Sequence, residues 1–389
     1  VMRRQNLVFI PGPTNIPERL RRAMDAPTWD HRAPDFADFV VPILSDLKQI
    51  FNSRDGEVLI FPASGTGGLE AAISNTLSPG DRVLSASYGM FSQRWIDLCK
   101  RYQLEVEIID AEWGDCAPVE LYQRALARDS GHKIKAVLVC HNETATGVTS
   151  DIGAIRAAMD ACNHPALLCV DAVSSIASID FRMDEWGVDL AVTGSQKGFM
   201  LSTGLAIIGI SQKALATIQS AGIPRAYFDF DSMLSANRAG SFPYTAPVNL
   251  LLGLRESINM LFEESMENVF KRHQRIATGI RSAVQAWGLS LCAQDSRFYS
   301  QTVSAIYVPE GLNSDTLVDL AYRKYGVSYG MGLGKLAGSS FRIGHLGMLS
   351  DVMALSGLAT IEMAMKDLDY PVQLGTGVAA AQEVYRIEQ

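Results

Sequence analysis

A single lysine stands directly after a short apolar run. Residues 189–193 (Asp-Leu-Ala-Val-Thr) predict a buried strand, and Lys197 follows between Gly194 and Gly198. In a partly dry pocket the pKa of a lysine amine falls, and the free amine becomes a nucleophile toward carbonyl groups. Such a lysine could anchor an aldehyde cofactor, whereas an isolated lysine at a strand end is more often a surface residue.

Further polar side chains follow other apolar runs, where the predicted strands end. In parallel sheets these carboxyl ends meet at one edge, and ligands bind there. We therefore expect one rim to carry Ser64, Thr66, His141, Thr144, Asp171 and Lys197.

Two of these groups suit the two ends of a phosphorylated pyridine. Asp171 could keep a ring nitrogen protonated, or it could simply cap a turn. Residues 64–68 (Ser-Gly-Thr-Gly-Gly) lie between a strand and a helix, where glycines and a helix start favour an anion. The segment matches neither G-x-G-x-x-G nor a P-loop, and a plain turn is the alternative.

Arg342 interrupts a strand-like run at residues 341–345. Its guanidinium could bind a substrate carboxylate with two parallel bonds, or it could form a structural salt bridge. The loop at residues 141–147 is polar but has no second histidine at metal-ligand spacing, so we expect no metal there. Residues 330–335 (Gly-Met-Gly-Leu-Gly-Lys) predict a flexible turn bordering the site.

The elements that must position these residues alternate between strands and helices. Such alternation predicts an α/β fold with a mainly parallel sheet covered on both faces. An extended arm at residues 1–14 precedes a helix that Asn15 would cap, and Ser150 would cap another. The expected strands are 57–61, 82–86, 106–109, 135–140, 167–170, 190–193 and 205–210, and the expected helices 35–51, 69–77, 91–102, 118–128 and 151–162.

The last third of the chain reads as a smaller α+β domain. We expect helices at 266–287, 315–325 and 351–365, the last of the chain, and strands at 303–308 and 339–343. The predicted division is an N-terminal arm (1–16), a large domain (17–261) and a small C-terminal domain (262–389).

Composition narrows the class of protein. Among 389 residues 48% are apolar, and the net charge of −8 argues against a nucleic-acid surface. The six cysteines include no C-x-x-C pair and predict reduced thiols in a cytoplasmic protein, without a disulfide framework or zinc site. No apolar run reaches membrane-spanning length, and the N-terminus lacks a signal-peptide pattern.

Taken together, these segments resemble class V aminotransferases of fold type I, in the alanine–glyoxylate and serine–glyoxylate group. The likeness spans nearly the whole chain, and its signature is residues 171–175 (Asp-Ala-Val-Ser-Ser) followed by 194–197 (Gly-Ser-Gln-Lys). Residues 30–32, 141–147 and 184–189 resemble bacterial serine–glyoxylate and aspartate–glyoxylate aminotransferases most. The resemblance implies an aspartate aminotransferase-like fold with a seven-stranded sheet, and pyridoxal 5′-phosphate as cofactor.

The resemblance also implies catalytic roles. Lys197 would form the Schiff base with the cofactor and move the proton, Asp171 would pair with the pyridinium nitrogen, and Arg342 would hold the substrate α-carboxylate. Phe91 would stack on the ring, where family members often carry tryptophan, and Thr144 would lie beside it. The phosphate would be bound by Ser64, Gly65, Thr66 and Gln196, and by Thr245 of a second subunit.

That last contact implies a homodimer with shared active sites, with dimer or tetramer left open. The sequence departs from the family at residues 202–204 (Ser-Thr-Gly), where Pro-Pro-Gly or Pro-Ala-Gly is common, and at Phe242, which replaces a frequent tyrosine. Arg32 is the candidate cation for a donor's side-chain carboxylate, with an ordinary surface arginine as the alternative.

The expected function is transfer of an amino group from an L-amino acid to glyoxylate by a ping-pong mechanism. The donor stays open between aspartate, serine and alanine; the products would be glycine and a 2-oxo acid such as oxaloacetate or hydroxypyruvate. The alternative is another class V enzyme, a lyase or cysteine desulfurase, which needs a reactive thiol late in the chain. Only Cys292 follows Lys197, within an apolar run. A cofactor-binding protein without turnover is the other alternative.

Overall fold

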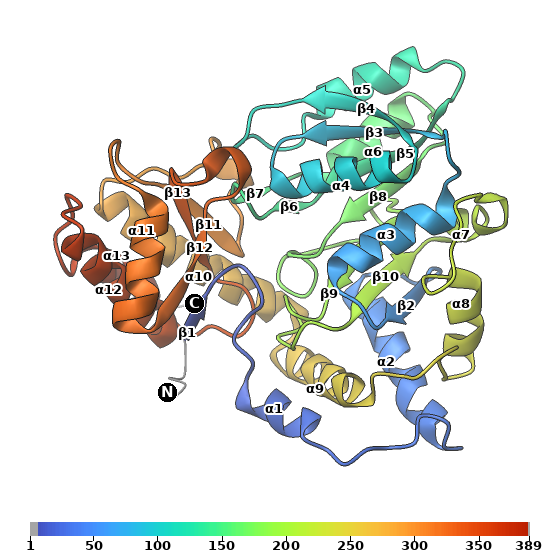
Figure 1. Ribbon diagram of the computed structural model, residues 1–389, viewed down its shortest axis with the longest axis horizontal. Coiled ribbons are helices and arrows are strands. Elements are labelled where there is room, and N and C mark those ends of the chain that lie inside the picture. The colour runs from blue at the N-terminus through green and yellow to red at the C-terminus, as the bar shows by residue number, and fades with distance from the viewer. Residues whose placement is uncertain (1–6, 388–389) are drawn as a thin grey trace.

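The computed structural model describes residues 7–387 and is built around a seven-stranded sheet (Figure 1). Its strands, in spatial order, are β2 (Glu57–Phe61), β10 (Ala206–Ile210), β9 (Leu190–Gly194), β8 (Leu167–Asp171), β5 (Ile134–Cys140), β3 (Arg82–Ser87) and β4 (Glu105–Asp110). Only β10 runs against its neighbours, β2 and β9, while the other pairs are parallel. The mainly parallel, seven-stranded sheet is therefore confirmed.

Apolar residues dominate the central strands because both faces of the sheet are covered. Every residue of β8, β9 and β10 is buried. Figure 1 shows the helices surrounding this sheet; α3 packs on β9 and β10, and α4 on β3 and β4. The helices of this part are α1 (Glu18–Met24), α2 (Phe36–Ile50), α3 (Gly65–Thr76), α4 (Met90–Arg101), α5 (Val119–Arg128), α6 (Ile152–Ala161), α7 (Gln212–Leu215), α8 (Phe230–Arg238) and α9 (Val248–Glu264), with the 3₁₀ turn η1 (Ile218–Ser220).

The helix starts differ from the predictions in three places. Helix α3 begins at Gly65, so the segment predicted as a loop forms its first turn. Asp151 caps α6 by accepting a bond from the Ala154 amide, whereas the Ser150 hydroxyl accepts one from the Ala117 amide at 3.0 Å. The predicted cap by Ser150 is therefore wrong, because the neighbouring carboxylate reaches the helix amide instead.

Asn15 does not cap a helix either. Its side-chain amide exchanges two bonds with the backbone of Val8, at 3.1 and 2.7 Å. Helix α1 starts later, at Glu18, with Pro17 before it and no side-chain cap. The Asn15 amide thus holds the N-terminal arm in its extended course.

The C-terminal part forms a second, four-stranded sheet at the left of Figure 1, with three strands in orange and the arm strand in dark blue. Its order is β1 (Leu7–Phe9), β12 (Val327–Met331), β13 (Ser340–Gly344) and β11 (Val303–Tyr307). The arm strand β1 runs parallel to β12. The accompanying helices are α10 (Met266–Ala286), α11 (Ser314–Leu320), α12 (Asp351–Asp367) and α13 (Thr376–Arg386), with the short turns η2 (Ser296–Phe298), η3 (Ala321–Tyr325) and η4 (Gly334–Leu336).

Two predictions for this part need correction. The helix predicted to be the last, α12, is followed by α13. The predicted flexible turn at 330–335 is the end of β12 followed by the 3₁₀ turn η4. The predicted helix at 315–325 is present, as α11 continued by a π-helical turn, η3.

Among the described residues the two large apolar cores follow the two sheets, and a third, small cluster contains Cys292, Ala305 and Leu336. The first extends along the chain as far as Val269, and the second takes up residues of α10 from Ile276 onward. The second also includes Phe9 of the arm. The first six residues of the predicted arm and the last two of the chain lie outside the described residues. Among the described helices, none combines the length and apolarity needed to cross a bilayer.

Candidate active site

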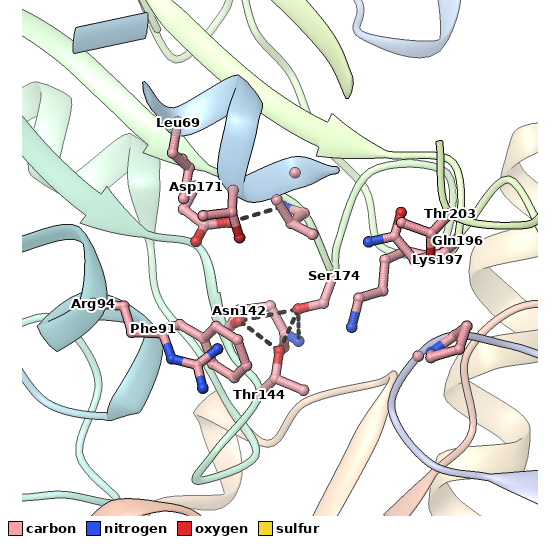
Figure 2. Close-up of a pocket in the computed structure, with 15 residues that line it drawn as sticks. Leu69, Phe91, Arg94, Asn142, Thr144, Asp171, Ser174, Gln196, Lys197 and Thr203 are labelled. Carbon is pink, nitrogen blue, oxygen red and sulfur yellow. Dashed lines mark hydrogen bonds between the residues drawn. The ribbon is translucent and has the colours of Figure 1, made fainter. Parts of the chain in front are cut away.

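A cavity of about 270 Å³ opens where β5, β8 and β9 end (Figure 2). It brings together seven of the predicted site residues: Gly65, Thr66, Phe91, Thr144, Asp171, Gln196 and Lys197. The other lining residues are Gly12, Pro13, Leu69, Arg94, Asn142, Val173, Ser174 and Thr203. One cavity therefore holds a lysine, a strand-end carboxylate and a helix start, as the strand-end pattern predicted.

Lys197 follows β9, and Figure 2 shows its amine pointing into the cavity. The amine donates a hydrogen bond to the carbonyl oxygen of Pro11. Burial, together with the positive charge of Arg342, lowers the pKa of Lys197 to about 8, and the Asp171 carboxylate opposes this shift. A lysine with this pKa is partly unprotonated near neutral pH, as a nucleophile or general base requires.

The N-terminal arm passes directly over this lysine. Gly12 has φ +104°, and a Cβ there would lie 2.5 Å from Lys197 Nζ. Farther along the arm, the amide of Thr14 donates to the carbonyl oxygen of Gln196 at 3.2 Å. Only glycine allows the backbone both this conformation and this approach.

Asp171 ends β8, beside the strand that leads to Lys197. Its side chain is buried, and Oδ1 accepts a hydrogen bond from the Val173 amide at 3.0 Å. Burial raises the pKa of Asp171 to about 6, while this hydrogen bond and the charge of Lys197 oppose the shift. A carboxylate in this state would be stabilised by a cationic ring nitrogen.

The start of α3 can receive an anion. The Ser64 side chain makes no capping bond, so the first amides of the helix keep free donors. Gly65 fits tightly, because a Cβ there would lie 2.6 Å from a methyl carbon of Val173. Gln196 also faces the cavity, and its buried Oε1 has no hydrogen-bond partner. A bound group could therefore satisfy both the amides and this side chain.

A hydrogen-bonded network forms another wall of the cavity. The hydroxyls of Thr144 and Ser174 lie 2.7 Å apart, and Asn142 Nδ2 donates to Ser174 Oγ at 2.8 Å and to Thr302 Oγ1 at 3.0 Å. Asn142 belongs to the short hairpin of β6 (Asn142–Glu143) and β7 (Val148–Thr149). The network thus connects the cavity to a residue just before β11 of the second sheet.

Arg342 lies on β13, behind the cavity wall rather than on its lining. It is buried and donates to two carbonyl oxygens, Nε to Met331 at 2.9 Å and Nη1 to Thr144 at 3.2 Å. Burial lowers its pKa to about 10, which the Glu143 carboxylate opposes. No carboxylate lies within ion-pair distance of Arg342 in the described part of the chain, which argues against the alternative of a structural salt bridge.

The other predicted residues lie elsewhere. Ser64 precedes the first turn of α3 but does not line the cavity, and Thr245 is exposed on the surface. Arg32 is also exposed and outside the lining. Sequence reasoning missed Arg94 as a cavity residue, although it follows Phe91 by one helical turn. Thr203 was noted only as a departure from the family pattern, yet it lines the cavity.

The thiols and the metal-binding residue types of the described part of the chain are candidates for a second site. Among the described residues no three His, Cys, Asp or Glu side chains gather as a metal site. All six cysteines are free. Burial raises the pKa of Cys292 to about 12, and its amide is bound to the carbonyl oxygen of Ala305. A buried thiol with a raised pKa forms little thiolate near neutral pH, so the desulfurase alternative is not favoured.

Comparisons with known proteins agree with this geometry. Residues 29–331 match the aminotransferase class-V family. The chain is 56% identical to the L-aspartate–glyoxylate aminotransferase of Paracoccus denitrificans, over 99% of this chain and 97% of the relative. It is 53% identical to the serine–glyoxylate aminotransferase of Hyphomicrobium methylovorum, over 97% and 94%. The crystal structure of ureidoglycine–glyoxylate aminotransferase from Bacillus subtilis superposes with a TM-score of 0.92 at 26% identity, over 99% of each chain. The chain therefore belongs to the class V aminotransferases.

Proposed function

We propose that this protein transfers the amino group of an L-amino acid to glyoxylate, with pyridoxal 5′-phosphate as cofactor. The observation that carries the proposal is the pair of Lys197 and Asp171, which neighbouring strands bring into one cavity with opposite pKa shifts. The names of the relatives support glyoxylate as the acceptor, and name both aspartate and serine as donors.

The residues of the cavity fit this cofactor. The start of α3 and Thr66 would hold the phosphate, with the unpaired Oε1 of Gln196 and the nearby Ser64 available to the groups around it. Asp171 would pair with the ring nitrogen, and Phe91 and Thr144 would lie against the ring. When bound, pyridoxal phosphate supplies an aldehyde for the amino group and a ring that withdraws electrons from the substrate.

The protein side chains contribute proton transfer and orientation. We propose that Lys197 anchors the cofactor and that its Nζ, once free, removes the proton from the substrate Cα. Its pKa of about 8 keeps a useful fraction of the amine unprotonated. Arg342, whose hydrogen bonds to described residues go to two carbonyl oxygens, would bind the substrate α-carboxylate.

The assembly and organisation of the chain are part of the same proposal. Thr245 is exposed, which is consistent with a role toward the phosphate of a second subunit in a homodimer, or in a tetramer built from dimers. The two large cores support the division into a large domain at 17–261 and a small domain at 262–389, and we propose that residues 1–16 are an arm that joins the two. The six free cysteines agree with a cytoplasmic location.

The test is to follow both halves of the reaction. With each of aspartate, serine and alanine as donor, purified protein loaded with the cofactor should form a 2-oxo acid, and then convert glyoxylate to an equal amount of glycine. Lys197→Ala should lower turnover about a hundredfold to ten-thousandfold, as expected for loss of a general base. Lys100→Ala, an exposed lysine of α4, is the control. Unchanged turnover in Lys197→Ala, or no glycine from any donor, would refute the proposal.

A further inference from the structure

Arg94 places a guanidinium in the lining of the cavity, whereas the guanidinium of Arg342 lies behind the cavity wall. Arg94 lies on α4, three residues after Phe91, and its Cζ stands 5.2 Å from the centroid of the Phe91 ring. Figure 2 shows the two side chains together at the end of the cavity opposite Lys197. Stacking on an aromatic face fixes the plane of a guanidinium, which then presents its fork to a ligand.

Within residues 7–387 no carboxylate forms an ion pair with Arg94. Its side chain is exposed to the cavity and solvent. Its charge acts against Arg342, whose pKa it helps to lower. The nearby Glu143 is already engaged, because its oxygens accept bonds from the amides of Phe91, Ser92 and Ala145.

The cavity therefore has an excess of positive charge toward a ligand. Asp171 is the carboxylate among its lining residues, against the cations Lys197 and Arg94, with Arg342 close behind. A neutral amino donor such as serine offers one carboxylate and leaves Arg94 without a partner. A dicarboxylic donor offers one carboxylate for each guanidinium.

We propose that Arg94 binds the side-chain carboxylate of a dicarboxylic amino donor of the aspartate type, while Arg342 holds the α-carboxylate. This inference rests on the proposed aminotransferase function and specifies its donor. It replaces Arg32 as the second cation, because Arg32 is exposed outside the cavity lining. The start of α3, at Gly65 and Thr66, has its own donors for the phosphate, so Arg94 is left for the substrate.

The binding test uses two probes of similar size on the cofactor-loaded protein. Succinate carries two carboxylates and butyrate one, and their dissociation constants are measured by calorimetry. The parent protein should bind succinate more tightly. Arg94→Ala should weaken succinate about tenfold to a hundredfold, the range for a charge-assisted hydrogen bond, and leave butyrate within about twofold. Arg94→Lys should keep part of the affinity, and Arg101→Ala, an exposed arginine of the same helix, should change nothing.

The kinetic test compares donors. In Arg94→Ala the kcat/KM for aspartate should fall by the same factor as succinate binding, with the value for serine retained. An equal fall for both donors, a loss of cofactor on dialysis, or a parent protein that binds succinate no better than butyrate would overturn the inference. The proposed function fails separately, if the parent protein transaminates no donor. If the parent is active but Arg94→Ala keeps its aspartate-to-serine ratio, only the inference fails.

Discussion

At the residue scale, the same burial acts in opposite directions on Lys197 and Asp171. Removing charge from water disfavours the ammonium and the carboxylate alike, so the pKa of the lysine falls to about 8 and that of the aspartate rises to about 6. The Asp171 carboxylate stabilises the ammonium form of Lys197, and the positive charge of Arg342 destabilises it. The reactivity of the amine therefore depends on neighbours of both signs.

This dependence predicts opposite shifts in two variants. Capture of pyridoxal phosphate by Lys197 in cofactor-free protein, trapped with borohydride and read by peptide mass, should rise with pH around a midpoint near 8. Arg342→Gln removes a repelling positive charge, so the ammonium is favoured and the midpoint should move upward. Asp171→Asn removes an attracting negative charge, so the midpoint should move downward.

The control for this prediction is Arg101→Gln, which alters an exposed arginine outside the cavity lining and should leave the midpoint in place. A midpoint near that of an ordinary lysine, or shifts of the same sign in both variants, would contradict the proposed coupling of the three charges.

The sequence alone reveals polar residues that interrupt an apolar pattern. The residues predicted in this way are those at the ends of the strands. Lys197 and Asp171 were predicted because each follows a buried strand, and the fold brings both to one cavity. Arg94 was missed because an arginine on the polar side of a helix is indistinguishable from a solvated one. Ser174 was missed because its importance depends on a hydroxyl contact with Thr144, which no spacing reveals.

At the element scale, the buried carboxylate of Glu143 connects α4, the helix that carries Phe91, to the loop that carries Thr144. Glu143 lies on β6, and its two oxygens accept bonds from the amides of Phe91 and Ser92 at the start of α4 and of Ala145 in its own loop, at 2.9 to 3.2 Å. Its side chain passes so close that a Cβ at Gly89 would lie 2.1 Å from it. A carboxylate at a helix start also complements the helix dipole.

We expect Glu143→Gln to weaken this connection, although glutamine has nearly the same shape as glutamate. Both carboxylate oxygens accept from amides, so the side-chain NH₂ of glutamine would face a donor instead of an acceptor. The free energy of unfolding in urea should fall by about 1 to 3 kcal/mol, the cost of leaving a buried hydrogen-bonding group unpaired.

The matched control is Glu120→Gln, the same change at the exposed first turn of α5. It should cost less than about 1 kcal/mol. Equal stability of the two variants would show that Glu143 does not hold α4 in place. The KM of the amino donor should also rise in Glu143→Gln alone, because Phe91 and Arg94 lie on the helix that it holds.

Most elements of the large sheet were predictable because short apolar runs bounded by polar residues are a local signal. Helix α13 was not, because it packs on α10, far back in the chain, where the Tyr385 hydroxyl donates to the carbonyl oxygen of Ile276 at 2.9 Å. Glu362 of α12 accepts bonds from the Trp287 side chain at 2.8 Å and from the amides of Gly375 and Gly377, at 2.7 and 2.6 Å. A buried glutamate in the middle of a helix reads as a surface residue until its partners are known.

At the scale of the whole molecule, the N-terminal arm pairs with the C-terminal sheet. Strand β1 pairs in parallel with β12 across more than 300 residues, so the arm completes the second sheet before it passes over Lys197 at Pro11 and Gly12. Such a contact leaves no periodicity in the sequence, and for this reason the arm was predicted only as extended. The lysine of the cavity is therefore covered by a segment that is held by the C-terminal sheet.

The free energy of unfolding of the whole molecule should also depend on pH through Asp171. Asp171 has an ordinary pKa of 3.8 and a folded pKa of about 6, so between these pH values the folded chain binds more protons than the unfolded one. Stability from this group is then full below about pH 4 and is lost as the pH rises through 6. Since one pKa unit corresponds to about 1.4 kcal/mol, the loss is about 3 kcal/mol in the cofactor-free protein.

Asp171→Asn should remove this loss. The variant keeps an oxygen for the Val173 amide, so cofactor-free protein at pH 8 should gain up to about 3 kcal/mol in its free energy of unfolding, and little at pH 4. Asp189→Asn is the contrasting control: this buried carboxylate accepts from Leu168 and Ser211 at 2.8 Å and pairs with Lys213, so its loss should destabilise. If Asp171→Asn were destabilising at pH 8, the carboxylate would be serving the fold. A gain in stability with a loss of transamination would instead show that the Asp171 carboxylate serves catalysis. Its ionised form would then destabilise the fold until a cationic ring nitrogen binds.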